Sequence, residues 1–517
     1  MGSRRLAGGA AFILGNSLVL FFFDHRDTPP RTELEGVLYL GNVLLHLVLG
    51  LLAFWPFFLL LKAFLRRWRG GPFRGELRLV GGLALASLAV CLGTGLYLLL
   101  VGNLRPQRPF LWAHMATAAL SLALGTLYAG LWVRRQASSP QDDGLWVWRW
   151  GRWATVLALA LPLLFLGLKG GVKTSANTIE NPRWPPESAW EEGDGKEGPF
   201  FPSSIQAKHK GFFPPEYFTD SASCGKSGCH PDIYRQWFAS AHRFSSFNNQ
   251  WYRKSVEYMQ EVAGTRPTKW CGGCHDPAVL LTEMPGTGRS RMDFPIKDQV
   301  WPPKAFPTSH AGLGCASCHS IVQVKSTMGQ ADFILDFPPL HRYAVSANPL
   351  LRAAHDFLIR RAPEPHKKTF LKPFHTEAEQ VSKFCSACHK VHLDKPVNHF
   401  RWLRGFNEYD SWQASGVSGY GAQSFYYPRN PRTGQPAFKT CVDCHMPPEP
   451  SRDAGALPGE NGSWVHSHRF LAANTALPFS HGWDGKQWTG GSEELLTKTD
   501  ANNYMEQFAR TVGFLRG

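Results

Sequence analysis

Acidic residues and methionine are scarce in this sequence, whose 517 residues include 40 Asp and Glu against 55 Lys and Arg, and only 8 Met. The net charge of +15 would suit nucleic acid, but the basic residues form no block on a recognisable nucleic-acid-binding module. We therefore exclude that class, and the positive charge calls for other anionic partners. The 13% of aromatic residues argues against disorder, and the length argues against a single compact core.

Histidine and cysteine are nearly absent from the first 170 residues, which hold three histidines and one cysteine. This part instead consists of long apolar runs at 6–23, 37–61, 79–101, 110–133 and 153–168. Most of them reach the ~20 residues that a helix needs to cross a bilayer. The sequence therefore predicts a transmembrane domain of five helices over 1–170. Because no small-x-small cleavage site precedes Asp24, we interpret the first run as an uncleaved anchor rather than a signal peptide.

Lysine and arginine are distributed unevenly over the links between these runs. One set of alternate links carries twelve: Arg4, Arg5, Lys62, Arg66, Arg67, Arg69, Arg74, Arg78, Arg134, Arg135, Arg149 and Arg152. The other set carries four: Arg26, Arg31, Arg105 and Arg108. Because cytoplasmic loops carry the excess, we expect a bacterial inner-membrane protein with a cytoplasmic N-terminus and a periplasmic C-terminal half.

Two histidines lie inside the apolar runs, His46 in the second and His114 in the fourth. An ionisable side chain within a membrane span is a candidate functional residue. The second and fourth spans run in the same direction and both histidines fall in the outer leaflet, so together they would supply the two axial ligands of one haem b. The alternatives are a hydrogen bond to a neighbouring helix or contact with a quinone headgroup.

The remaining ten cysteines all follow a Pro- and Gly-rich segment at 171–220, which predicts an extended linker before a second domain at 221–517. They form five pairs, and a histidine follows each pair directly. Four pairs have the spacing Cys-x-x-Cys-His, whereas the first has four residues between its cysteines. The motifs are Cys224/Cys229/His230, Cys271/Cys274/His275, Cys315/Cys318/His319, Cys385/Cys388/His389 and Cys441/Cys444/His445. Chance at this composition would give only about 0.01 Cys-x-x-Cys-His motif.

The spacing of these motifs suits covalent attachment of haem c. Two thioethers reach two vinyl groups on one edge of a porphyrin, and the next residue turns under the ring to offer an imidazole to iron. A zinc ribbon or a structural disulfide would explain the paired cysteines but not the histidine after every pair. We therefore expect five haem c groups with the five motif histidines as proximal ligands. Their propionates would offset much of the positive charge.

Twelve further histidines in this half are available for the second axial positions. Because methionine is scarce, His/His ligation is favoured over His/Met, which implies low-potential, six-coordinate haem that moves electrons. His242 is the leading distal candidate because it ends a predicted helix that starts at Pro231, and His468 is next. The other candidates, which spacing does not rank, are His310, His341, His355 and His375.

Three stretches of this half resemble a known family. They are Cys224-Gly-Lys-Ser-Gly-Cys-His-Pro-Asp-Ile-Tyr-Arg-Gln-Trp-Phe-Ala-Ser-Ala-His242, Gly314-Cys-Ala-Ser-Cys-His, and Cys441-Val-Asp-Cys-His-Met-Pro with the later Ser467-His-Arg-Phe. Over about residues 221–480 the sequence is similar to the multihaem cytochromes c related to hydroxylamine oxidoreductase and its tetrahaem electron acceptor. The resemblance implies stacked haem pairs on a mostly helical, loop-rich scaffold, with His242 and His468 as distal ligands. The enzymes of this family have a lysine in place of one proximal histidine and a crosslinking tyrosine. We assign neither residue in this sequence, so the resemblance does not extend to their catalytic activity.

Together these features predict a mainly α protein, with a five-helix transmembrane bundle followed by a helical, loop-rich multihaem cytochrome c domain. We expect it to carry electrons between the membrane, either the quinone pool or a membrane complex, and a periplasmic redox partner, rather than to act on a substrate of its own. One alternative is an oxidoreductase with one open haem site, first suspected at Cys224 and Cys229, acting on a small nitrogen or sulfur compound. Another is an anchoring and electron-transfer subunit of a larger respiratory or photosynthetic complex.

Overall fold

The chain folds into two compact units that are largely helical. The computed structural model describes residues 2–26, 32–69, 75–135, 142–170, 178–184, 186–302, 304–395, 397, 403–426, 438–475 and 498–516. Unit 1 comprises Met1–Thr174 and Ser346–Lys368, and unit 2 comprises Ser175–Val345 and Thr369–Gly517. Helices predominate in both units and the strands are short, so the prediction of a mainly α protein is confirmed.

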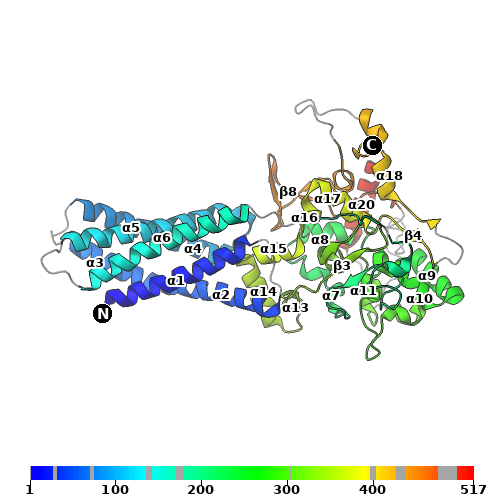
Figure 1. Cartoon of the computed structure of the whole chain (residues 1–517), viewed down its shortest axis with the longest axis horizontal. Coiled ribbons are helices and arrows are strands. Elements are labelled where there is room, and N and C mark those ends of the chain that lie inside the picture. The colour runs from blue at the N-terminus through cyan, green and yellow to red at the C-terminus, as the bar shows by residue number, and fades with distance from the viewer. Residues whose placement is uncertain are drawn as a thin grey trace. The chain divides into compact units, whose positions relative to one another are not determined.

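Long apolar helices make up most of unit 1 (Figure 1). They are α1 (Gly2–His25), α2 (Glu33–Leu52), α3 (Phe54–Arg69), α4 (Glu76–Val101), α5 (Arg108–Arg135) and α6 (Asp142–Gly170), with the short η1 (Arg105–Gln107) before α5. Within the described residues, five candidate membrane spans are long and apolar enough to cross a bilayer, with α2 and α3 together forming the second. The predicted spans are therefore confirmed as helices. Two of the arginines used for the orientation, Arg31 and Arg74, lie outside the described residues.

One end of this bundle is covered by a segment from the middle of the sequence. At this α1–α2 end, where α1 and α4 end and α2 and α5 begin, unit 1 also contains α14 (Pro349–Arg361) and the start of α15 (Glu364–Phe370). The amide of Asn103 donates to the carbonyl of Arg360 at 2.8 Å, and Arg108 forms an ion pair with Glu364. Gly102 has φ +107°, and a Cβ there would lie 3.1 Å from the Arg360 oxygen, so this contact requires glycine. The predicted second domain is therefore interrupted by a segment of unit 1.

Unit 2 consists of short helices and three small sheets connected by long loops (Figure 1). Its helices are η2 (Ala189–Glu191), α7 (Glu216–Thr219), η3 (Ser221–Ser223), α8 (Pro231–Phe238), α9 (Gln250–Ala263), α10 (Thr265–His275), α11 (Pro277–Leu280), η4 (Arg291–Asp293), η5 (Ile296–Gln299), η6 (Pro307–His310), α12 (Cys315–His319), α13 (His341–Ala344), α16 (Pro373–Thr376), α17 (Ala378–Ser386), α18 (Glu408–Ala414), η7 (Ala422–Tyr426), α19 (Cys441–His445) and α20 (Lys498–Leu515). The strands are β1 (Gln206–Ala207), β2 (Ile321–Val324), β3 (Phe333–Leu335), β4 (His392–Leu393), β5 (Leu403–Arg404), β6 (Pro448–Pro450), β7 (Leu457–Gly459) and β8 (Gly462–His466).

The sheets tie together distant parts of unit 2. In the first, β3 lies between β1, to which it is parallel, and β2, to which it is antiparallel. β4 pairs with β5, and β8 lies between β6 and β7, all antiparallel. The first sheet brings a segment before the first motif against the chain that follows the third motif.

The segment at 171–220 differs from the extended linker that its composition predicts. Residues 171–177 lie outside the described residues, but from 178 onward the chain belongs to the core of unit 2. Ile179, Phe200, Ile205 and Phe213 are all at most 7% exposed. These apolar side chains, spread between prolines and glycines, provide enough buried surface to hold a segment that has little regular structure.

Candidate functional site

The five cysteine motifs lie in single helical turns or at helix ends of unit 2. α12 and α19 each consist of one motif, and α10 ends on the motif Cys271–His275. Cys385 lies in the last turn of α17, and His389 follows that helix. The exception is the first motif, in which Cys224 follows η3 and His230 caps the N-terminus of α8. In a helical turn, residues three apart share a face, so the two thiols of each Cys-x-x-Cys pair point the same way.

Thiols from different motifs contact one another. Side-chain hydrogen bonds join three pairs: Cys224 with Cys315, Cys274 with Cys388, and Cys385 with Cys441. Cys318 lies close enough to Cys388 to interact with it electrostatically. None of the eleven cysteines, all of which the structure describes, forms a disulfide. The five motifs therefore form one continuous cluster within unit 2.

Three of the motif histidines are held by the same kind of hydrogen bond. Nδ1 of His275 donates to the carbonyl of Ser245 at 3.0 Å, Nδ1 of His319 to Phe370 at 2.8 Å, and Nδ1 of His445 to Leu471 at 2.6 Å. A carbonyl only accepts, so the proton of each neutral ring must be on Nδ1. This leaves Nε2 with its lone pair available to a metal, and such a bond also fixes the orientation of the ring.

Burial keeps the imidazoles of this cluster neutral. It lowers the pKa of His242 to about 3 and that of His468 to about 4, and neighbouring histidines add to both shifts. Burial also lowers the pKa values of four motif histidines: His230, His275, His319 and His389. The neutral imidazole is the form that binds a metal ion, so at neutral pH these side chains could bind one without losing a proton.

The two leading distal candidates each face a motif histidine. The ring centres of His319 and His468 are 6.2 Å apart, with their planes inclined by 24°. Those of His242 and His389 are 6.1 Å apart, with an angle of 71°. A metal–imidazole bond is about 2 Å long, so two rings on opposite sides of one iron have centres about 6 Å apart. Both pairs therefore have the spacing of axial ligands.

Two further candidates lie in the same cluster. His375 has its ring centre 5.0 Å from that of His319, and its Nδ1 accepts from the Lys372 amide at 3.0 Å. Its Nε2 is buried, and the ring interacts with the backbone of Cys318 in the third motif. His341 is 7% exposed and packs edge-on against Tyr217, with ring centres 5.2 Å apart.

The last two candidates are placed differently. Nε2 of His310 donates to the carbonyl of Val300 at 2.7 Å, which occupies the nitrogen that would bind iron. His355 is in α14 and therefore belongs to unit 1, whereas the five motifs belong to unit 2. Its Nδ1 lies 3.1 Å from Asp356 Oδ1. Neither arrangement resembles the two facing pairs.

A cavity of about 170 Å³ lies against the second motif. Its lining comes mostly from α9 and α10 and includes Met259, Cys271, Cys274 and His275. Tyr252 stacks on His275, with ring centres 4.6 Å apart and planes inclined by 18°. Of the described residues that line this cavity, His275 is the one histidine, so this motif differs from the two that have a facing imidazole.

In unit 1 the two predicted membrane histidines also come together. The ring centres of His46 in α2 and His114 in α5 are 6.2 Å apart, with planes inclined by 84°. Nδ1 of His46 donates to Asn16 Oδ1 at 2.8 Å, and Nδ1 of His114 donates to the Cys91 carbonyl at 2.9 Å. The amide group of Asn16 donates in turn to Asn42 Oδ1 at 2.7 Å, which fixes its oxygen toward His46.

Both Nε2 atoms of this membrane pair are therefore unprotonated, as in His275, His319 and His445. Gly95 on α4 makes room for the second ring, because a Cβ there would lie 3.0 Å from Cε1 of His114. The pair has the spacing, the tautomers and the close helix packing that one shared metal needs.

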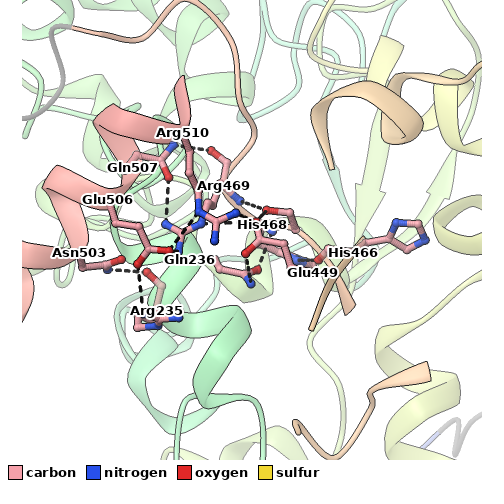
Figure 2. A network of polar contacts seen from close by, with 11 residues as sticks. Arg235, Gln236, Glu449, His466, His468, Arg469, Asn503, Glu506, Gln507 and Arg510 are labelled. Atoms are coloured by element: carbon pink, nitrogen blue, oxygen red, sulfur yellow. Dashed lines mark hydrogen bonds and ion pairs between the residues drawn. The ribbon is translucent and has the colours of Figure 1, made fainter. Parts of the chain in front are cut away.

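Figure 2 shows the polar network that holds the segment after the last motif. The amide of His468 donates to Gln236 Oε1 at 2.9 Å, and its Nδ1 donates to the carbonyl of His466 at 2.9 Å. The adjacent Arg469 has a fully buried side chain whose guanidinium bonds Glu506 at 2.8 Å and Gln507 at 3.3 Å, both on α20. The C-terminal helix thus fixes the backbone next to a distal candidate.

Sequence reasoning missed the residues that position these histidines. Asn16 and Ser17 interrupt the first apolar run, and that interruption is a signal for a buried polar contact. Arg469 directly follows His468 and has no comparable signal, because an arginine in a loop is usually exposed.

Comparison of the chain with protein-family models, with curated proteins and with solved structures finds no match. Among the described residues, no group of three or more His, Cys, Asp and Glu side chains is arranged to hold a metal ion.

Proposed function

We propose that this protein is a membrane-anchored pentahaem c-type cytochrome that carries electrons between the membrane and an extracytoplasmic partner. The observation that carries the proposal is the pairing of imidazoles inside one cluster of five cysteine motifs. His319 with His468 and His242 with His389 have the separation that a shared iron requires. The resemblance of residues 221–480 to the hydroxylamine oxidoreductase and tetrahaem cytochrome group supports the same conclusion.

The residues present fit covalently bound haem. The motif cysteines would form the thioethers, the motif histidines the proximal bonds, and when bound the group supplies a one-electron Fe(III)/Fe(II) couple. The chain's own residues orient the imidazoles through backbone carbonyls, hold them neutral by burial and exclude water. Because thiols of separate motifs touch, neighbouring haems would lie close together, as an electron-conducting chain needs.

A haem b between His46 and His114 is part of the proposal. It would provide the entry or exit point within the bilayer, where a quinone pool is the available two-electron carrier. Lysine and arginine are in excess before the first apolar run and in the links after the second and fourth runs. This distribution supports a cytoplasmic N-terminus. We therefore propose that the protein lies in a bacterial inner membrane with its motif domain in the periplasm. Its redox partner would be a periplasmic or membrane protein, and the chain would be a subunit of a larger complex.

Haem content relative to protein tests this proposal. We expect a pyridine haemochrome spectrum to give about five c-type haems and about one b-type haem per chain. Replacing Cys441 and Cys444 by serine should remove one c-type haem, whereas Cys91→Ser, which alters the cysteine in α4, should leave all c-type haems attached. A colourless protein, or an intact mass equal to that of the bare polypeptide, would contradict the proposal.

A second candidate function has one observation in its favour. The cavity at the second motif is lined by His275 but by no other histidine among the described residues, which is the arrangement of an open haem site. Such a site would bind a small nitrogen or sulfur compound at iron. Electron paramagnetic resonance distinguishes the two functions: a stoichiometric high-spin ferric signal supports the enzyme, and low-spin signals alone support the electron carrier.

A further inference from the structure

A buried carboxylate and a phenol meet at the α1–α2 end of unit 1. The hydroxyl of Tyr39 in α2 donates to Oδ1 of Asp24 in α1 at 2.6 Å. Tyr39 is 1% exposed. Among the described residues, this is the one hydrogen bond of the Asp24 carboxylate. The proposed haem sites use neither side chain.

This pair lies two helical turns from the membrane histidines. On α2, Tyr39 precedes His46 by seven residues, and on α1, Asp24 follows Ser17 by seven residues. Ser17 Oγ is 3.5 Å from His46 Nδ1. Seven residues are almost two turns and rise about 10 Å along a helix, so residues at this separation share a face. The Asp24–Tyr39 pair therefore lies about 10 Å from the His46 layer, toward the α1–α2 end.

Several charged groups lie near the pair. Lys368 donates through Nζ to the backbone carbonyl of Asp24. Glu364 and His25 also interact with Asp24, and Arg26 with Tyr39. Most of these neighbours have other partners: Arg26 forms an ion pair with Glu35, Glu364 with Arg108, and His25 Nδ1 lies 2.9 Å from the carbonyl of Phe21. No ion pair of the described residues includes the Asp24 carboxylate, although the charge of Lys368 acts on it.

An aromatic cluster adjoins the carboxylate. Phe21 and Phe22 of α1 pack edge-on against Phe165 of α6, with ring centres 6.5 and 5.0 Å apart. The ring of His25 stacks on Phe21 at 4.1 Å, and Phe23 packs against Tyr39 at 5.4 Å. Half-buried aromatic rings in a membrane domain offer flat apolar faces to a planar ring from the bilayer.

We propose that the α1–α2 end binds a quinol and that the Asp24–Tyr39 pair accepts its protons. The proposal rests on the proposed function, because it requires the b-type haem between His46 and His114 as the oxidant. An O–H bond of the quinol breaks, its proton passes to the carboxylate of Asp24, and an electron passes to the ferric iron. Before the step repeats, the first proton leaves Asp24 for the water at this end of the bundle and the first electron moves on to the c-type haems. The second step then gives the quinone, with two electrons and two protons released in total.

The variant Asp24→Asn tests this assignment, because it keeps the size and removes the acceptor. We expect reduction of the b-type haem by a short-chain quinol to slow by about 100-fold or more, while dithionite still reduces that haem fully. Glu35→Gln, which alters another carboxylate at the same end, should change the rate by no more than a few-fold. Quinol reduction at the wild-type rate in Asp24→Asn overturns the proposal.

A second measurement does not depend on turnover. An electron on an iron held between His46 and His114 would raise the proton affinity of a carboxylate two helical turns away. The midpoint potential of the b-type haem should therefore fall with rising pH in the wild-type protein and lose this dependence in Asp24→Asn. An unchanged pH dependence in the variant overturns the proposal but leaves the proposed function intact. A protein with five c-type haems and no b-type haem overturns the proposal and the haem b part of the proposed function, but not the pentahaem electron carrier.

Discussion

Replacing Arg469 by methionine should undock the C-terminal helix α20. The change keeps an unbranched side chain of similar reach and removes a guanidinium that has no exposed surface. That group bonds Glu506 and Gln507 on α20 and lies 3.5 Å from Glu449, which is 10% exposed. Breaking a buried ion pair by removing one partner costs about 3–5 kcal/mol. Because Glu449 and Glu506 both keep a contact with Arg510, we expect the lower end, about 3 kcal/mol.

Hydrogen exchange of the α20 amides measures this cost directly, because it reports local opening. Each 1.4 kcal/mol is about a tenfold change in an equilibrium constant, so α20 amides should exchange about 100-fold faster in Arg469→Met. Arg510→Met is the matched control, since Arg510 is 45% exposed and an exposed ion pair contributes about 1 kcal/mol or less. If α20 exchanged at the wild-type rate in Arg469→Met, the buried network would not be what holds the helix.

Three further predictions concern the haem sites. A haem between His319 and His468, whose rings are nearly parallel, should give a rhombic low-spin EPR signal. A haem between His46 and His114, whose rings are nearly perpendicular, should give a strongly anisotropic low-spin signal. Identical signals from the two haems would contradict the geometry. Gly95→Val should abolish the b-type haemochrome, because a Cβ there would crowd His114, whereas Gly93→Val, with open space at that position, should retain it. Burial raises the pKa of Asp276 from 3.8 to about 7, so this group costs stability as pH rises from about 4 through 7. Asp276→Asn should remove that loss, roughly 4 kcal/mol, as measured by denaturation at pH 4 and pH 8.

Much of the architecture follows from local sequence. Apolar runs predict the five membrane helices because a lipid-facing helix needs no pattern beyond length and apolarity. The motif spacing likewise marks all five cysteine clusters. The sequence predicts that His242 ends the helix that starts at Pro231 and serves a neighbouring motif. In the structure α8 ends at Phe238, so His242 lies four residues beyond it, and its ring faces that of His389.

Other features depend on tertiary contacts that sequence does not encode locally. In sequence, Leu351–Arg361 is typical of an amphipathic helix. The structure assigns the surrounding segment 346–368 to unit 1, with hydrogen bonds to Leu99 and Asn103. Residues 178–220 belong to the core, with Phe200 and Ile205 buried. Their sequence does not indicate this, because proline and glycine at this density are typical of linkers. The pairing of Asn16 with His46 joins two helices whose relative rotation only packing determines.

The inclusion of α14 in unit 1 has a practical consequence for anyone wishing to prepare the motif-bearing half without detergent. A truncated chain beginning at residue 175 would retain α14 but lose the helix ends that it caps, so the Arg361 side chain would forfeit the Leu99 carbonyl as its acceptor. Leu350, already 78% exposed, would then lie on a helix with no bundle or bilayer to shield it. A soluble version should replace residues 346–368 with a short polar loop.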